Sequence, residues 1–220
     1  MKKEKIIIAL FVACLFLFSC ENHTTNNSNL EEVKIGTQTW STKNLDVSIF
    51  RNGDTIPEAK TNDEWKKAGD EKRPAWCYYN NDPSKGKKYG KLYNWYAVND
   101  PVGLAPKGWH IPSDTEWTIL TDYLGGEDVA GTKMKSTSGW NDHEGKTGNG
   151  TNTNGFAGSP SGYRNEGGIF NNVGNFGGWW SSSESSTTSA WDRGLGFDVG
   201  NVGRGNDGKS LWLSVRCMRD

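Results

Sequence analysis

The sequence has few aliphatic side chains. Leucine, isoleucine, valine and phenylalanine make up roughly 14% of the residues after position 19, a share that accompanies disorder when the net charge is high. The net charge is low, at −1, and 11 tryptophans and 7 tyrosines supply apolar area instead. Because each buried aromatic ring removes about 150–250 Å² from water, we predict a folded core built mainly of rings.

The sequence also lacks a large excess of either positive or negative charge. Without residues 1–19, which hold three lysines and one glutamate, 22 basic and 25 acidic side chains remain. This balance lacks the excess of basic side chains that is typical of nucleic-acid-binding proteins, so we predict no nucleic-acid partner. His110 and His143 are the only histidines after position 32, and they lack the spaced nitrogen and sulfur partners of a zinc site. We therefore predict no metal and no cofactor.

No apolar run is long enough to span a membrane. The longest, Ile6–Phe18, follows a basic start and falls short of the roughly 20 residues that a span needs. We interpret residues 1–19 as a signal peptide. The four residues that end at Cys20 resemble a bacterial lipobox, in which the cysteine receives a lipid. An ordinary secretory signal with an incidental cysteine is the alternative.

The polar stretch 20–32 has no periodicity and is predicted to be a flexible tether. Residues 33–220 then form one domain. With a lipid on Cys20 as its membrane contact, the mature protein is expected in the bacterial cell envelope, outside the cytoplasm, on the outer membrane.

Cysteine is scarce as well. Of four cysteines, Cys14 lies within the signal peptide and Cys20 takes the lipid, which leaves Cys77 and Cys217. In an exported protein one disulfide is favoured over two free thiols, so we predict a Cys77–Cys217 bond. Two buried unpaired thiols are the alternative.

Local patterns predict short helices and strands. Capping boxes at Thr61–Glu64 and Ser113–Glu116 each begin a helix, and Asp128–Lys135 is expected to form another. Leu92–Val98 shows one apolar helical face. Near the N-terminus, Val33–Leu45 is typical of a hairpin.

The second half of the domain is less regular. Residues 139–178 are dominated by glycine, asparagine, serine and threonine with isolated rings, which favours an ordered loop held by those rings. Alternating apolar residues at 195–199 and 211–217 predict a terminal hairpin, with the opening hairpin beside its last strand.

Six ordered motifs from Val33 to the C-terminus together resemble the Fibrobacter succinogenes major paralogous domain, a family of bacterial lipoprotein domains. The resemblance implies no established activity. The motifs are Ile35–Trp40, Trp76–Asn81, Tyr89–Val98, Gly108–Trp117, Gly178–Ser182 and Ser214–Cys217.

A more distant likeness concerns the fold. The segment Gly108–Trp117 and the Arg216-Cys217 pair are similar to motifs of formylglycine-generating enzymes. That family implies an α+β fold of the C-type lectin-like kind, with short helices around small antiparallel sheets and long irregular loops. Its active members hold copper with two cysteines, and here Cys77 and Cys217 are assigned to the predicted disulfide.

Candidate binding residues come from the irregular half. Trp140-Asn141-Asp142 repeats a tripeptide of sugar-binding C-type lectins, where amide and carboxylate oxygens hold Ca²⁺. Its distance from Cys217 favours coincidence. Trp179 and Trp180 precede a run of serines, and exposed rings among hydroxyls are typical of binding surfaces. A position in the core is the alternative for Trp140, Trp179 and Trp180.

No catalytic residues emerge from the sequence, because it has no nucleophile elbow and no phosphate loop in a strand-to-helix context. Our leading hypothesis is a non-catalytic, envelope-anchored binding domain for an extracellular glycan or protein. The alternatives are a catalytic relative of formylglycine-generating enzymes and a structural surface protein without a small ligand.

Overall fold

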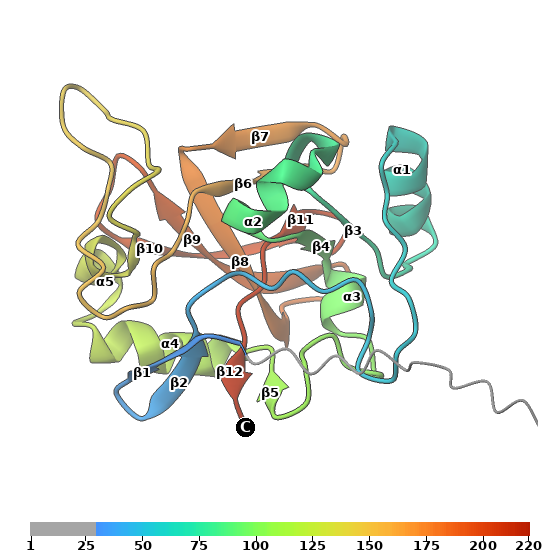
Figure 1. The fold of residues 1–220 in the computed structure, drawn as a ribbon, viewed down its shortest axis with the longest axis horizontal. Coiled ribbons are helices and arrows are strands. Elements are labelled where there is room, and N and C mark those ends of the chain that lie inside the picture. The colour runs from blue at the N-terminus through green and yellow to red at the C-terminus, as the bar shows by residue number, and fades with distance from the viewer. Residues whose placement is uncertain (1–29) are drawn as a thin grey trace, which may run out of the picture.

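The protein is described by a computed structural model that covers residues 30–220, where it forms two sheets flanked by short helices (Figure 1). The predicted signal peptide, Cys20 and most of the predicted tether lie outside the described residues. Within 30–220, no helix is both long and apolar enough to cross a membrane.

The helices are all short. Two of them, α1 and α4, begin with the predicted capping boxes, and α5 lies where a third helix was expected. Two 3₁₀ turns precede α2. The helices are α1 (Asn62–Asp70), α2 (Gly86–Tyr89), α3 (Trp95–Val98), α4 (Asp114–Tyr123) and α5 (Glu127–Met134).

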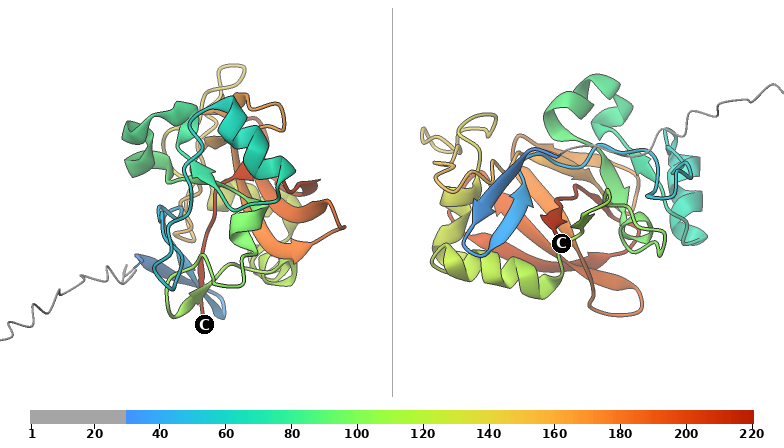
Figure 2. Two further views of the ribbon diagram at one scale, coloured as in Figure 1. Left: turned by 90° about the vertical axis from the view of Figure 1, so that its right-hand side faces the viewer. Right: turned by 60° about the horizontal axis from the view of Figure 1, so that its bottom comes forward.

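The smaller sheet brings the two ends of the domain together. Its strand order is β1-β2-β12-β5, and all of its pairings are antiparallel. The predicted opening hairpin is confirmed, with Gly36 in the turn at a φ of 62°. The hairpin lies beside the C-terminal strand, as expected (Figure 2). The strands are β1 (Glu32–Ile35), β2 (Gln38–Ser41), β5 (Trp109–His110) and β12 (Met218–Arg219).

The larger sheet is mixed. Its order is β10-β9-β8-β6-β11-β4-β3 with β7 on β6, and only β6 and β8 run parallel. The strands are β3 (Trp76–Cys77), β4 (Leu92–Asn94), β6 (Ser161–Arg164), β7 (Phe170–Val173), β8 (Phe176–Glu184), β9 (Ser189–Gly196), β10 (Val202–Gly208) and β11 (Trp212–Leu213).

Two element predictions were wrong. Residues 92–94 form a strand and only 95–98 are helical, because Asn94 caps the short helix through its side chain. The terminal hairpin joins β9 to β10, whereas β11 pairs with β4 and β6. Apolar alternation identified strands here but not their partners.

The core is indeed built of rings. Trp40 and Trp117 lie 4.7 Å apart between ring centroids, and Phe156 packs edge-on against both. Trp95, Trp109 and Trp117 are all buried, as predicted. The prediction of one irregular loop over 139–178 was only partly right: Trp140 and Phe156 are buried and hold its first part, but β6, β7 and the start of β8 lie in its second part.

Candidate functional site

Trp179 and Trp180 do not form an exposed surface, and this prediction was wrong. Both are fully buried on β8, a strand with neighbours on each side. Successive strand residues face opposite sides of a sheet, so each ring enters a different core cluster. Their indole N–H groups donate to Asn44 Oδ1 at 2.8 Å and to the Tyr93 carbonyl at 2.9 Å.

The Trp140-Asn141-Asp142 tripeptide is divided between core and surface. Trp140 is buried, and its indole N–H donates to the Gly158 carbonyl at 3.1 Å. Asn141 and Asp142 are exposed, and the Asn141 amide donates to Asn175 Oδ1 at 2.8 Å. Across residues 30–220, histidine, cysteine and carboxylate side chains form no group of three or more that would suit a metal ion.

The predicted disulfide is also wrong, because Cys77 and Cys217 are both free and buried. They belong to different core clusters: Cys77 lies on β3 beside Arg164, whereas the Cys217 N–H donates to Ser41 Oγ at 3.0 Å. Burial raises the pKa of each thiol to about 12, which disfavours the thiolate. A count of cysteines carries no information about where each lies in the core.

A cleft in the described part of the chain lies elsewhere, between α1 and the tip of the β8–β9 hairpin. It encloses about 450 Å³, and we call it the α1 cleft. Its aromatic walls are Trp65, from the buried face of α1, and the half-buried Tyr96 of α3.

The lining of the α1 cleft also carries hydroxyl groups. Thr187, Thr188, Ser189 and Ser210 line it, and the two threonines are exposed. Our sequence interpretation missed these hydroxyl groups. The serine and threonine run 185–189, placed between two strands, was the available signal.

Charged side chains of both signs complete the α1 cleft. Lys209 is buried and donates from Nζ to Glu184 Oε1 and to the Thr187 carbonyl, both at 3.0 Å, with Nζ 4.6 Å from the centroid of a Trp95 ring. This arrangement fixes the hairpin tip against the domain. Lys66 pairs with Asp70, and Lys72 and Glu166 also line the cleft.

A carboxylate pair lies on the neighbouring strands. Asp192 of β9 is buried, and its Oδ2 has no hydrogen-bond partner among the described residues. Burial and the nearby Asp207 carboxylate raise the pKa of Asp192 to about 7. The pair can hold a proton near neutral pH, but it does not line the α1 cleft. It does not line a second cleft either, which has a volume of about 400 Å³ and lies beside α2.

Residues 30–220 form an α+β domain with an aromatic core and polar surface clefts. A comparison with family models matches residues 33–219 to the Fibrobacter succinogenes major domain. The chain belongs to this family, as its six motifs indicated. The search of curated proteins gave no match.

Proposed function

We propose that the protein is a non-catalytic binding domain, anchored to the cell envelope, that holds an extracellular glycan in the α1 cleft. The observation that carries this proposal is the composition of the cleft. Sugars present apolar C–H faces and many hydroxyls, and the cleft is lined by two aromatic side chains together with serine and threonine hydroxyl groups.

The size and position of the α1 cleft support the same proposal. A volume of about 450 Å³ falls within the range of small-ligand pockets. The lining residues include members of α1, α3 and the hairpin tip, and the Lys209 contacts join the hairpin tip to α3. A pre-formed cleft of this kind costs little to order when a ligand binds.

A glycan array tests the proposal. The wild-type protein is compared with Thr187→Val/Thr188→Val, which removes two hydroxyls and keeps the side-chain shape. Thr37→Val/Thr153→Val is the matched control, because both of its threonines are exposed and lie outside the α1 cleft. We expect selective binding by the wild type and the control, and a signal reduced about tenfold in the cleft variant. Equal signals would contradict the α1 cleft, and association with one envelope protein without glycan binding would favour a protein ligand.

The anchor belongs to the same proposal. The short apolar run that ends at Cys20 supports export and lipid attachment at that thiol. Labelled fatty acid should enter the wild-type protein but not Cys20→Ala, and label in the variant would contradict the anchor.

The finer fold assignment is likewise a proposal. The likeness of Gly108–Trp117 to formylglycine-generating enzymes and the mix of short helices with small sheets support a C-type lectin-like fold. Superposition of an experimental structure of this protein on such an enzyme tests the assignment. A different strand connectivity would overturn it.

A further inference from the structure

A second cleft, of about 400 Å³, lies where the segment after β2 passes below α2 (Figure 1). We call it the Arg216 cleft. The segment and α2 are joined closely, since the Asn44 amide donates to the Tyr89 carbonyl at 2.8 Å and the Lys91 N–H donates to the Leu45 carbonyl at 3.1 Å. Gly90 permits this approach: its φ is 69°, and a Cβ there would lie 2.8 Å from the Leu45 oxygen.

Arg216 lines this cleft and is itself almost completely buried, with 1% of its surface exposed. Its Nε donates to Asn44 Oδ1 at 2.7 Å, Nη1 donates to the Ser41 and Phe156 carbonyls at 2.7 and 2.8 Å, and Nη2 donates to the Ala157 carbonyl at 3.1 Å. These contacts use four of the five N–H groups of a guanidinium.

All four acceptors of Arg216 are neutral. No carboxylate within residues 30–220 forms an ion pair with it. A buried charge without an opposite charge is costly, and burial lowers the pKa of Arg216 to about 9. A bound anion would relieve this cost.

The remaining charges of the cleft leave an excess of cations. Its two acids are already engaged, because Glu31 pairs with Lys43 at 2.7 Å and Asp46 pairs with the buried Lys91. Lys87 and Lys88 are exposed and have no carboxylate partner in the described part of the chain. Arg216, Lys87 and Lys88 are therefore three positive charges at one cleft that form no ion pair, since the two acids of its lining pair with other lysines.

We propose that the Arg216 cleft binds an oxyanion, the carboxylate, sulfate or phosphate group of a ligand, with the fixed guanidinium at its base and the two lysines at its rim. Asn44 holds the guanidinium in place, because its Oδ1 accepts from Arg216 Nε and from the buried Trp179 indole. Charge-assisted hydrogen bonds to such groups are the stronger kind. This site is separate from the α1 cleft and does not depend on the function proposed for it.

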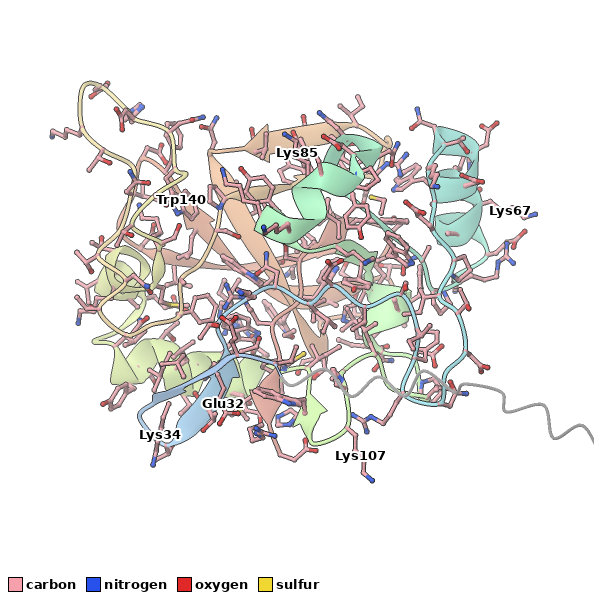
Figure 3. All side chains as sticks on the ribbon, viewed as in Figure 1. Glu32, Lys34, Lys67, Lys85, Lys107 and Trp140 are labelled. Atoms are coloured by element: carbon pink, nitrogen blue, oxygen red, sulfur yellow. The ribbon has the colours of Figure 1, made fainter. Side chains whose placement is uncertain are left out.

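Titration calorimetry with sodium sulfate, sodium phosphate and sodium acetate tests this proposal, with sodium chloride added to keep the ionic strength equal. The wild-type protein is compared with Lys87→Gln/Lys88→Gln. The control Lys34→Gln/Lys107→Gln makes the same change in net charge, and Figure 3 shows both of these lysines at the lower edge of the molecule, away from α2. A parallel series with Arg216→Lys, checked for folding by circular dichroism, keeps the charge but removes the planar fork.

We expect at least one of the three oxyanions to bind the wild type and the control with equal affinity, and to bind Lys87→Gln/Lys88→Gln about tenfold more weakly. The anion that binds most tightly identifies the group on the ligand. Equal affinity in the rim variant and the control would overturn the proposal, as would an absence of binding by all three oxyanions in the wild type.

Discussion

Trp179 and Trp180 show how a single residue in this protein depends on its surroundings. Each ring is fully buried and each indole N–H is satisfied by an oxygen from another part of the chain. Removal of either ring would leave a large cavity and remove a buried hydrogen bond. The stability of the domain therefore depends on both.

We predict that Trp179→Ala and Trp180→Ala each lower the free energy of unfolding by about 3–5 kcal/mol, as Trp117→Ala should. The control is Ile169→Ala, because Ile169 is 60% exposed and should change stability by less than about 0.5 kcal/mol. Urea denaturation measures all four variants. A change at Trp179 as small as that at Ile169 would mean that the ring is exposed in solution.

Asp192 gives the molecule a pH dependence. Its folded-state pKa of about 7 lies above the ordinary value of 3.8, so folding favours the neutral acid. The stabilisation is complete below about pH 4 and is lost as the pH rises through 7, at about 1.4 kcal/mol per pH unit in between. Asp192→Asn should remove this dependence, as measured by unfolding at pH 4, 6 and 8. A wild type and a variant with parallel stability profiles would show that Asp192 titrates normally.

At the scale of elements, the capped helices are the clearest case. In α4 the Ser113 Oγ accepts from the Glu116 N–H, and Glu116 Oε2 accepts from the Ser113 N–H at 2.7 Å. Both contacts stabilise the first turn. The helix carries Trp117 into the core, so the cap also positions that ring.

We predict that Ser113→Ala lowers the free energy of unfolding by about 1 kcal/mol. Ser138→Ala is the control, because Ser138 is an exposed loop serine and its substitution should have almost no effect. Thermal denaturation of both variants measures the difference. If the two substitutions lower stability equally, the cap contributes nothing.

Elements with local signals were predictable from the sequence. The capping boxes fix the starts of α1 and α4, and Gly36 fixes the first hairpin, because each signal acts within a few residues. Strand pairing was not predictable in the same way. The residues of β11 alternate like a hairpin strand but pair with β4 and β6, which lie 48 or more residues away along the chain.

The candidate sites, like the strand pairings, depend on contacts between distant segments and were not predictable from local patterns. The α1 cleft assembles Trp65, Tyr96 and Thr187 from three distant segments, and no local pattern connects them. Trp179 and Trp180 are candidates for an exposed surface from the sequence alone, because a run of serines follows them, and a core position is the alternative. The order of strands in the sheet, which a single sequence does not reveal, buries them instead.

For the whole molecule, the free thiols mean that no covalent bond closes residues 30–220. Stability there rests on the three core clusters and on buried arginines such as Arg164, whose Nη1 donates to the Ala59 carbonyl at 3.0 Å. Redox conditions should then have little effect on folding.

We predict that dithiothreitol leaves the melting temperature unchanged. Alkylation under denaturing, non-reducing conditions should modify both Cys77 and Cys217, and neither should react in the native protein, because both are buried. A cross-linked peptide that contains both cysteines would show that they form a disulfide and would contradict this prediction.

Ligand binding in the α1 cleft can be measured by lysine acetylation with mass-spectrometric readout, in the presence and absence of a glycan that binds on the array. Lys66 and Lys72 line the α1 cleft, whereas Lys34 and Lys107 lie elsewhere on the surface and Lys87 and Lys88 line the Arg216 cleft. If the glycan occupies the α1 cleft, we expect slower acetylation of Lys66 and Lys72 alone when the glycan is bound. Unchanged rates at these two lysines, with protection at any of the others, would contradict it.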